Sequence, residues 1–430
     1  MHKLIIILAL ALCLQVNAQE ISELASMPEA VSNNAVCLAK LGDRNYLYSF
    51  GGIDESKLFS GIHKRCYRYS LEDDSWESIP DLPSGNGRIA AGASFVKGKI
   101  YIFGGYEVFA DLSERTFDEV HIFDPLTNDY LPNGEAIPVA TDDHVQAVYK
   151  DSLIFLVSGW SDDTNIPNVQ IYNPETDSWQ MGTSTPDSPS FTAFGASGEI
   201  IGDTIYYSGG VRIVNGGFAM SNTFRKGYIN PSDPTDITWE SSFSFPSIGY
   251  RMAAGILYDR EVIWIGGSTT GYNFDGLSYF DGQGVEPVSR ILHFRPSNQS
   301  FRNTAIDLDL MDLRGLGQFN DYTFYLCGGM GPGQQVTDKT FKIEFSPVSN
   351  QEIALEENIV FPNPSSGAVF FSKTNEFDVI KITNLRGEFI QELNESADGS
   401  LRLTHLPKGI YFLRFEKNNS TSKVQKLIIN

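Results

Sequence analysis

The sequence predicts an all-β protein: a six-bladed β-propeller followed by a small antiparallel β-sandwich. Three observations lead to this prediction. A diglycine, or a drifted copy of one, ends six short apolar strands at a spacing of about 50 residues, which is a period typical of propellers. The strands between these glycines are short, and no window has a helical period. After residue 346 the pattern changes to a second set of alternating strands.

The six copies share a glycine at the second position and an apolar, aromatic-rich run before it. The third copy has drifted to Ser-Gly-Trp but keeps that glycine. Six phased copies predict six blades of similar construction. The copies are Phe50-Gly51-Gly52, Phe103-Gly104-Gly105, Ser158-Gly159, Ser208-Gly209-Gly210, Ile265-Gly266-Gly267 and Cys327-Gly328-Gly329.

The second repeat shows the expected blade most clearly. Residues 88–95 form a strand of small side chains, which suits the crowded propeller axis, and residues 100–103 form an apolar strand that ends at the diglycine. Residues 119–124 and a strand through Tyr130 complete the four-stranded sheet. Glycine lets the backbone pass close to the next sheet, while the aromatic side chain of the outer strand fills the gap between blades.

Together these features resemble the kelch repeat, in which an apolar strand ending in Gly-Gly is followed by a Tyr-Asp-Pro-like turn and then by Trp. Residues 171–174 with Trp179 match this pattern, as do residues 67–69 with Trp76 and residues 122–125 with Tyr130. The fifth repeat departs from it, because no Trp follows Phe294. The resemblance covers about residues 20–346 and implies a closed ring of blades.

The sixth repeat is one strand short, since it runs through residues 313–318, 323–329 and 341–345 and then stops. Residues 21–28 resemble residues 76–83, which form the outer strand of the first repeat. We therefore expect the N-terminal strand to complete the last blade of a propeller domain spanning residues 19–346, which removes an exposed sheet edge.

The first 18 residues are predicted to be a signal peptide. Lys3 supplies the positive start, residues 4–14 are apolar, and Val16-Asn17-Ala18 is a small-residue cleavage site,. A lipoprotein alternative would use Cys13, but the preceding Leu12 is bulky for such processing. The apolar core is too short to span a bilayer, and no later segment is long enough. We expect an exported monomer without a transmembrane segment.

Charge narrows the class of partner. The whole chain has a formal charge of −21, and residues 19–358 alone carry 22 basic against 46 acidic side chains. Such a surface repels phosphate backbones, so we expect no nucleic-acid partner. It also offers no basic patch to an anionic membrane.

The C-terminal segment is predicted to be a separate domain, residues 359–430, after a polar linker at residues 347–358. It resembles the type A C-terminal sorting domain of the type IX secretion system. The resemblance implies a bacterium of the Bacteroidota lineage, passage through the periplasm, and outer-membrane export by the type IX machinery, with the protein then released or attached to the surface. An ordinary accessory sandwich that binds carbohydrate is the alternative. The matching residues are Pro362, Asn363, Pro364, Gly367, Gly387, Gly409, Tyr411 and Lys426.

A ligand site is expected at the mouth of the propeller channel, on the loop before each innermost strand. The repeat register makes Asn34, Arg88, His144, Phe194, Arg251 and Arg314 equivalent. The kelch resemblance implies that arginines at this position bind carboxylates, so the candidate ligand residues are Arg88, His144, Arg251 and Arg314. In the alternative, each arginine pairs with a neighbouring carboxylate of this acidic domain.

No cofactor, metal site or catalytic residue is predicted. Asp142-Asp143-His144 is interpreted as a solvated turn, and Asp307, Asp309 and Asp312 lack the glycine and glutamate of a calcium loop. The cysteines that follow the leader are Cys37, Cys66 and Cys327, an odd number that favours buried free thiols over a disulfide framework,.

Three functions are compatible with the sequence to different degrees. The first is a binding module for a peptide or glycan at the channel mouth, which we favour over an enzyme. The second is a sugar-ring isomerase like the kelch-type sialic acid (N-acetylneuraminate) mutarotase or epimerase, with His144 or Glu107 as acid or base by position only. The third, a copper-radical oxidase, fits poorly because Cys66 lies in a third strand, away from the axis.

Overall fold

A computed structural model describes residues 19–242, 249–346, 360–361, 363–371, 379–385, 388–394, 400–417 and 420–430. Contacts divide the chain into two compact units, Met1–Pro347 and Val348–Asn430. The described residues contain strands and two short 3₁₀ turns, η1 (Phe59–Gly61) and η2 (Pro332–Gln334). Within these residues no helix is long and apolar enough to cross a membrane. The predicted signal peptide and linker lie outside the described residues.

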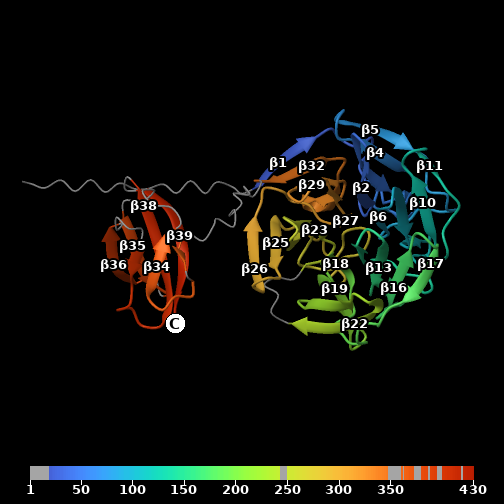
Figure 1. Cartoon of the computed structure of the whole chain (residues 1–430). Coiled ribbons are helices and arrows are strands. Elements are labelled where there is room, and N and C mark those ends of the chain that lie inside the picture. The colour runs from blue at the N-terminus through green and yellow to red at the C-terminus, as the bar shows by residue number, and fades with distance from the viewer. Residues whose placement is uncertain are drawn as a thin grey trace, which may run out of the picture. The chain divides into compact units, whose positions relative to one another are not determined.

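The first unit contains six blade sheets arranged around one axis (Figure 1). Its described loops add three two-stranded sheets: β8 (Tyr106–Val108) with β9 (Glu114–Thr116), β14 (Trp160–Ser161) with β15 (Thr164–Asn165), and β30 (Met330–Gly331) with β31 (Gln335–Val336). The first blade, from the axis outward, is β2 (Ala35–Leu41), β3 (Arg44–Phe50), β4 (Cys66–Ser70) and β5 (Ser75–Ile79). The second is β6 (Gly92–Val96), β7 (Lys99–Phe103), β10 (Val120–Asp124) and β11 (Asp129–Tyr130). The third is β12 (Val145–Tyr149), β13 (Leu153–Val157), β16 (Val169–Asn173) and β17 (Ser178–Met181).

The remaining blades repeat this order. The fourth is β18 (Phe194–Ile201), β19 (Thr204–Val214), β21 (Phe224–Asn230) and β22 (Asp233–Ser242), with β20 (Gly217–Met220) added to β19. The fifth is β23 (Ala253–Leu257), β24 (Glu261–Ile265), β25 (Arg290–Arg295) and β26 (Ser300–Ala305). The sixth is β28 (Gly317–Gln318), β29 (Thr323–Cys327), β32 (Thr340–Phe345) and β1 (Gln19–Leu24). The predicted six-bladed all-β propeller is confirmed.

The N-terminal strand lies in the last blade. β1 pairs antiparallel with β32 from Gln19 opposite Phe345 to Leu24 opposite Thr340. In Figure 1 the blue strand β1 therefore lies beside the orange strand β32. Ile21 packs against the apolar cluster between the fifth and sixth blades. The short strand β27 (Arg314–Gly315) pairs in parallel with β2 and links the sixth blade to the first. The first and last strands of the propeller therefore share one sheet.

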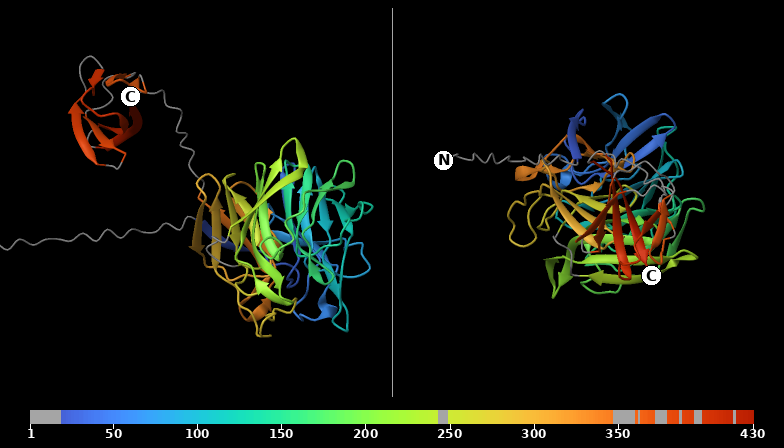
Figure 2. Two further views of the ribbon diagram at one scale, coloured as in Figure 1. Left: turned by 90° about the horizontal axis from the view of Figure 1, so that it is seen from below. Right: turned by 60° about the vertical axis from the view of Figure 1, so that its left-hand side comes forward.

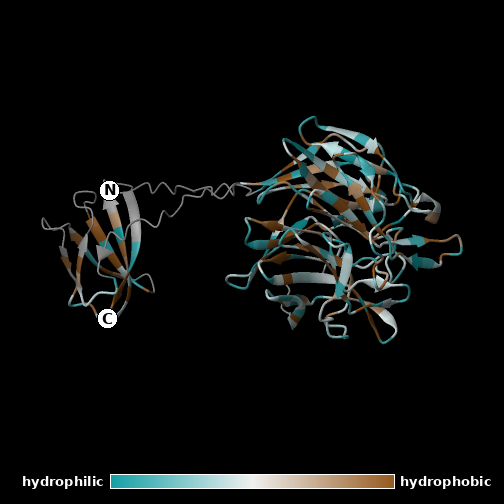
Figure 3. Cartoon of the chain, turned by 45° about the vertical axis from the view of Figure 1, so that its right-hand side comes forward, coloured by the Kyte–Doolittle hydropathy of each residue, from teal (hydrophilic) through white to brown (hydrophobic). Residues whose placement is uncertain are grey.

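The diglycines sit where one blade approaches the next. Gly104 has a φ of +57°, and a Cβ atom there would lie 2.0 Å from the carbonyl oxygen of Thr141. A larger residue would therefore clash with the backbone that leads into the third blade. The second strand of a blade is apolar and buried for most of its length, as in β7, β13 and β24, and Figure 3 shows apolar residues concentrated in the blade strands. The outer aromatic residues pack between blades as expected: Trp179 contacts Phe103 of the preceding blade at 5.7 Å between ring centroids.

The second unit is a β-sandwich of two antiparallel sheets around one apolar core. One sheet contains β33 (Val360–Phe361), β34 (Ala368–Phe371) and β37 (Ser400–Arg402). The other contains β36 (Phe389–Asn394), β35 (Val379–Asn384), β38 (Gly409–Lys417) and β39 (Ser420–Ile429). Figure 2 shows the sheets of each unit from two further directions.

The motif residues of this unit hold its first segment against its last strand. The Asn363 amide donates to the carbonyl oxygen of Lys426 (2.6 Å) and accepts the N–H of Ile428 (2.9 Å). Gly367 has a φ of +106°, and the Tyr411 hydroxyl donates to the Pro407 carbonyl at 2.8 Å. Pro364 follows Asn363, Gly409 begins β38, and Pro362 and Gly387 lie outside the described residues.

Candidate ligand site at the channel mouth

A closed ring of hydrogen bonds surrounds the axis where the chain enters the innermost strand of each blade. Five steps join a backbone N–H to a backbone carbonyl of the preceding blade. The sixth joins the Ala90 N–H to the side-chain Oδ1 of Asn33 at 2.9 Å. The backbone steps are Asp143 to Ala90 (3.0 Å), Gly195 to Asp143 (2.9 Å), Arg251 to Gly195 (2.8 Å), Leu313 to Arg251 (3.1 Å) and Asn33 to Asp312 (3.3 Å).

This ring depends on an unusual backbone conformation repeated six times. One residue at each ring position has a positive φ, although only one of the six is glycine. A left-handed conformation costs a non-glycine residue roughly 1–2 kcal/mol, so the ring and its side-chain contacts must hold it in place. The six residues are Asn33 (54°), Ala90 (55°), Asp143 (45°), Gly195 (63°), Arg251 (48°) and Asp312 (63°).

The strand pairing corrects the sequence register of the arginines. Gly92 and Ala253 are equivalent, because each pairs with the residue before its diglycine. Arg88 lies four residues before Gly92, whereas Arg251 lies two residues before Ala253. Arg314 occupies a third register position, because it lies after Asp312, which is the ring residue of the sixth blade. The expected equivalence of the three arginines is therefore wrong, and they do not form a symmetric triad.

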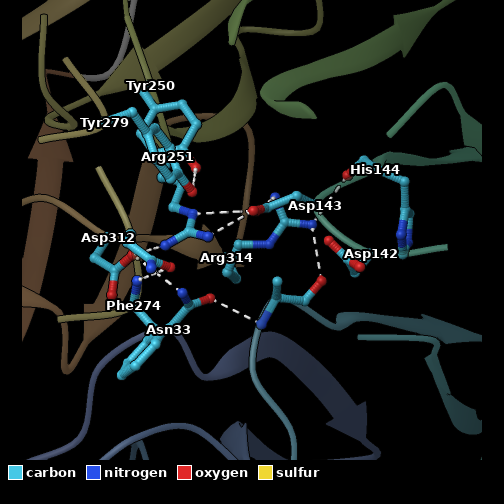
Figure 4. Close-up of polar contacts among 12 residues, drawn as sticks. Asn33, Asp142, Asp143, His144, Tyr250, Arg251, Phe274, Tyr279, Asp312 and Arg314 are labelled. Carbon is cyan, nitrogen blue, oxygen red and sulfur yellow. Dashed lines mark hydrogen bonds and ion pairs between the residues drawn. The ribbon is translucent and has the colours of Figure 1, made fainter. Parts of the chain in front are cut away.

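Arg251 lies at the centre of a buried ion cluster (Figure 4). Its Nε and terminal nitrogen approach the carboxylate of Asp143, the shortest contact being 2.6 Å, and its other terminal nitrogen donates to Asp312 at 2.8 Å. The guanidinium group also stacks on Tyr250 and Tyr272, 5.1 and 5.6 Å from the ring centroids. The charge of Asp143 raises the pKa of Arg251 well above its ordinary value, against the effect of burial.

Arg314 binds the same carboxylate from the other side. Its guanidinium group lies 3.3 Å from Oδ1 of Asp143 and donates to the His144 carbonyl oxygen at 3.0 Å. Two guanidinium groups and the carboxylates of Asp143 and Asp312 therefore balance one another in the cluster. The interpretation of Asp142-Asp143-His144 as a solvated turn is wrong: all three are at least 98 % buried, because the Arg251 and Arg314 pairs and the bridge between Asp142 and Trp160 enclose them.

Arg88 is separate from this cluster. It is fully buried, pairs with Glu119, donates to the Gly104 carbonyl oxygen at 2.9 Å, and stacks on Phe117 at 4.4 Å. Hydrogen bonding from His121, together with the Arg88 charge, lowers the pKa of Glu119 to about 2. Arg88 thus stabilises the second blade locally, in the way that the ion-pair alternative expects.

His144 lines the central channel on the inner side of the ring, in a cavity of about 300 Å³. Its Nε2 lies 3.0 Å from Oε1 of Gln146, and burial lowers the pKa of the ring to about 3, so the ring is neutral. Glu199 lines the same cavity, where burial raises its pKa to about 8. Of the four predicted ligand residues, the structure brings Arg251 and Arg314 together around Asp143, joins His144 to them through its backbone carbonyl, and leaves Arg88 apart.

A second cavity, of about 250 Å³, opens on the mouth side of the ring, and we call it the mouth pocket. Four of its aromatic rings form one cluster: Phe194 contacts Trp160 at 5.0 Å, and Phe218 contacts Tyr279 at 4.7 Å and Trp160 at 5.9 Å. The rings come from the third, fourth and fifth repeats. The lining residues are Tyr106, Glu114, Asp142, Asp143, Trp160, Phe194, Phe218, Arg251, Asn273 and Tyr279.

Two carboxyl groups that line the mouth pocket form no ion pair with a cation of the described residues. Asp142 accepts a hydrogen bond from Thr116 at 2.8 Å, and burial, followed by the charge of Asp143, raises its pKa well above the ordinary value. Desolvation by the surrounding loops also raises the pKa of Glu114, although the residue itself is exposed. Arg251, the cation on the pocket wall, is already bound to Asp143 and Asp312. The mouth pocket is therefore aromatic and short of positive charge.

Sequence reasoning missed this pocket. One signal was present, because Trp160 is the residue that makes the third diglycine depart from the others. Phe218 and Tyr279 lie in loops of unequal length, whose meeting point the repeat register does not define. The predicted free thiols are found as expected, since Cys37, Cys66 and Cys327 are buried and unbridged. Within the described ranges, no group of three or more His, Cys, Asp or Glu residues is arranged to hold a metal ion.

Two family models match the chain. Residues 9–210 match the KLHDC2/KLHL20/DRC7 Kelch-repeats domain, and residues 359–430 match the Secretion system C-terminal sorting domain. This is a secreted kelch-repeat protein. Its C-terminal unit is a type IX sorting domain, which indicates secretion and attachment at the cell surface.

The kelch protein is also similar to sugar-acid enzymes over a short region. N-acetylneuraminate epimerase of Escherichia coli O157:H7 is 28 % identical over 104 residues, and that of Escherichia coli strain K12 is 26 % identical over 104 residues. Each match covers 23 % of this chain and 28 % of the relative. A solved structure, "Structure of YjhT", covers 82 % of this chain and 98 % of its own with a TM-score of 0.56 and 16 % identity, which supports the fold alone.

Proposed function

We propose that the secreted kelch propeller is a binding module that holds a peptide or glycan in the mouth pocket. The observation that carries the proposal is the pocket itself: about 250 Å³, lined by five aromatic side chains on loops at one end of the propeller. Concave sites with aromatic walls and a few polar groups are the usual form of a ligand site, and loops on a rigid scaffold commonly carry binding residues.

The export route forms part of the proposal. Residues 1–18 act as a signal peptide that delivers the chain to the periplasm of a bacterium of the Bacteroidota lineage. The type IX machinery then recognises residues 359–430. The match of these residues to the sorting-domain model supports this route. Asn363 belongs to the motif at the start of the sorting domain. Its hydrogen bonds with Lys426 and Ile428 hold this motif against β39, the last strand of the domain.

Paired charges favour binding over catalysis. Arg88, Arg251 and Arg314 all contact carboxylates of the protein, and His144 is neutral and faces the channel. Glu107, the other candidate acid or base, is 5 % exposed and pairs with Arg115 at 2.6 Å. None of these groups is free to exchange a proton with a ligand in the mouth pocket.

The proposal is tested by probing glycan and peptide arrays with the secreted protein and two variants. Phe218 is 38 % exposed and packs on other rings of the pocket, so Phe218→Ala removes one wall without opening the core. Met181, 45 % exposed at the end of β17, provides the matched control Met181→Ala. We expect array signals that Phe218→Ala abolishes and Met181→Ala retains. Signals that survive Phe218→Ala unchanged would contradict a mouth-pocket site.

A sugar-ring isomerase is the second candidate, favoured by the similarity to N-acetylneuraminate epimerase over 104 residues. In the mouth pocket the acid would be Asp142, whose raised pKa keeps a proton available,. NMR exchange between the anomers of N-acetylneuraminate measures this directly. Acceleration by the wild type and its loss in Asp142→Asn would support the enzyme, whereas exchange at the uncatalysed rate would exclude it for this substrate.

A further inference from the structure

We infer that the mouth pocket recognises a cationic side chain, lysine or arginine, of a basic peptide segment. This inference rests on the proposed function, because it names the ligand class of the same site. It concerns the chemistry of the pocket wall, the charge of the loops around it and the size of the cavity, each of which points to the same kind of ligand.

The charge of the pocket wall is unbalanced. Arg251 is bound to Asp143 and Asp312, and Arg115, next to Glu114 in sequence, pairs with Glu107 instead. Asp142 is 2 % exposed yet lines the cavity with Thr116 as its hydrogen-bond donor. Among the described residues, Asp142 and Glu114 form no ion pair with a cation, although the charge of Arg251 acts on both carboxyls. A cation from the ligand would favour the ionised form of Asp142, which burial disfavours, and would pair with the exposed carboxylate of Glu114,.

The aromatic walls suit the same ligand. An ammonium or guanidinium group is attracted to the face of an aromatic ring, and most strongly to Trp. The neighbouring ion cluster already uses this chemistry, since Arg251 is held by the carboxylate of Asp143 and the rings of Tyr250 and Tyr272. The mouth pocket offers a second set of the same kind, with Trp160, Phe218 and Tyr279 as rings and Asp142 and Glu114 as carboxyls.

The surrounding loops match a basic peptide. The loops that follow the six diglycines span residues 53–62, 106–116, 160–166, 211–221, 268–287 and 330–337 and contain ten acidic but only three basic side chains. They also carry seven of the large apolar side chains that are exposed in the described structure. Exposed apolar groups with acidic neighbours favour a basic polypeptide with apolar residues of its own. The seven are Leu58, Phe59, Phe109, Leu112, Phe218, Leu277 and Phe280.

Cavity size limits how much of a ligand the mouth pocket can enclose. At about 250 Å³, the mouth pocket is smaller than the roughly 300–1,000 Å³ of most small-molecule sites, so it encloses one group, and its carboxyls make a cationic side chain fit better than a sugar ring. The rest of a peptide would lie over the loops. A sugar acid is disfavoured as well, because its carboxylate would lie near the negative charge of Glu114 while the nearby guanidinium groups are already paired,.

The test begins with a positional-scanning library of short soluble peptides bound to the secreted protein. The best peptide is then titrated by tryptophan fluorescence, to which Trp160 in the pocket contributes together with four other tryptophans, and compared with versions that carry norleucine or glutamate in place of the selected residue. We expect Lys or Arg to be selected at one position, and norleucine to weaken binding about tenfold. Glu114→Gln and Asp142→Asn should each reduce the preference for the cation, whereas Glu175→Gln, an exposed acid on the outer part of the third blade, should not. N-acetylneuraminate should not compete.

Three outcomes would overturn the inference: selection of apolar or acidic residues, equal binding of the norleucine peptide, or array binding to glycans alone. If Phe218→Ala still abolishes binding in those cases, the pocket is a ligand site for another class of ligand and only this inference fails. If Phe218→Ala changes nothing, the proposed function fails together with it.

Discussion

The side-chain carbonyl of Asn33 accepts the backbone N–H of Ala90 at 2.9 Å, and this contact closes a ring of hydrogen bonds whose other five steps are backbone to backbone. The Asn33 amide also donates to Asp312 at 3.2 Å. One side chain therefore joins the first blade to the second and to the sixth. Asn33 is close to 99 % buried, so water cannot replace it.

Asn33→Ala should therefore destabilise the propeller. It removes two buried hydrogen bonds and leaves the Ala90 N–H without its acceptor, which we expect to lower the free energy of unfolding by about 2–4 kcal/mol. Urea unfolding measures this change. Asn222→Ala, at an exposed loop position, is the control and should stay within about 0.5 kcal/mol of the wild type,. Equal stability of the two variants would mean that the ring does not hold the blades together.

Arg251 is predicted to be structural as well as part of the pocket wall. Arg251→Met would leave Asp143 and Asp312 buried without their main cation, a change that typically costs 3–5 kcal/mol. The double variant Arg251→Met/Asp312→Asn should recover part of that loss, because one of the two negative charges is removed. Thermal unfolding of both variants is the measurement. No destabilisation by Arg251→Met would show that the ion cluster is dispensable.

Stability should depend on pH through Asp142. Burial raises its pKa in the folded protein, so the folded state binds a proton more tightly than the unfolded chain. Stability is then greatest below the ordinary aspartate pKa of about 3.9 and falls as pH rises through the folded value. Asp142→Asn removes this penalty, so the variant should be more stable than the wild type at pH 8 and no more stable near pH 3. Parallel unfolding curves across this range would contradict the raised pKa.

The contribution of the N-terminal strand can be measured with Ile21→Asp. Ile21 packs against the apolar cluster between the fifth and sixth blades, and β1 covers the outer edge of β32. We expect a loss of about 1–3 kcal/mol from the buried charge and a tendency to self-associate, because an exposed strand edge is a template for pairing. Unfolding curves and light scattering test the two effects. Glu20→Gln, at an exposed position of the same strand, should do neither.

The repeat pattern predicted the blades because diglycines and outer aromatic residues are local features with a fixed period. The site was predicted only in part. Arg251 and Arg314 are visible in the sequence, but Asp143, which binds both, comes from the third blade, and Asp312 comes from the sixth. Contacts across the axis depend on the residue of left-handed conformation that precedes each inner strand. A shift of one residue in its register would point the neighbouring side chains in other directions. The aromatic pocket depends on where loops of unequal length meet.

The central claim is that the mouth pocket is the ligand site of a secreted binding module. It is tested most directly by titrating the secreted protein with its strongest array ligand while following tryptophan fluorescence, in the wild type, Phe218→Ala and Met181→Ala. We predict that Phe218→Ala raises Kd at least about tenfold, the loss of one well-placed aromatic contact, while Met181→Ala leaves Kd unchanged. The same Kd in all three proteins would place the ligand elsewhere and contradict the claim.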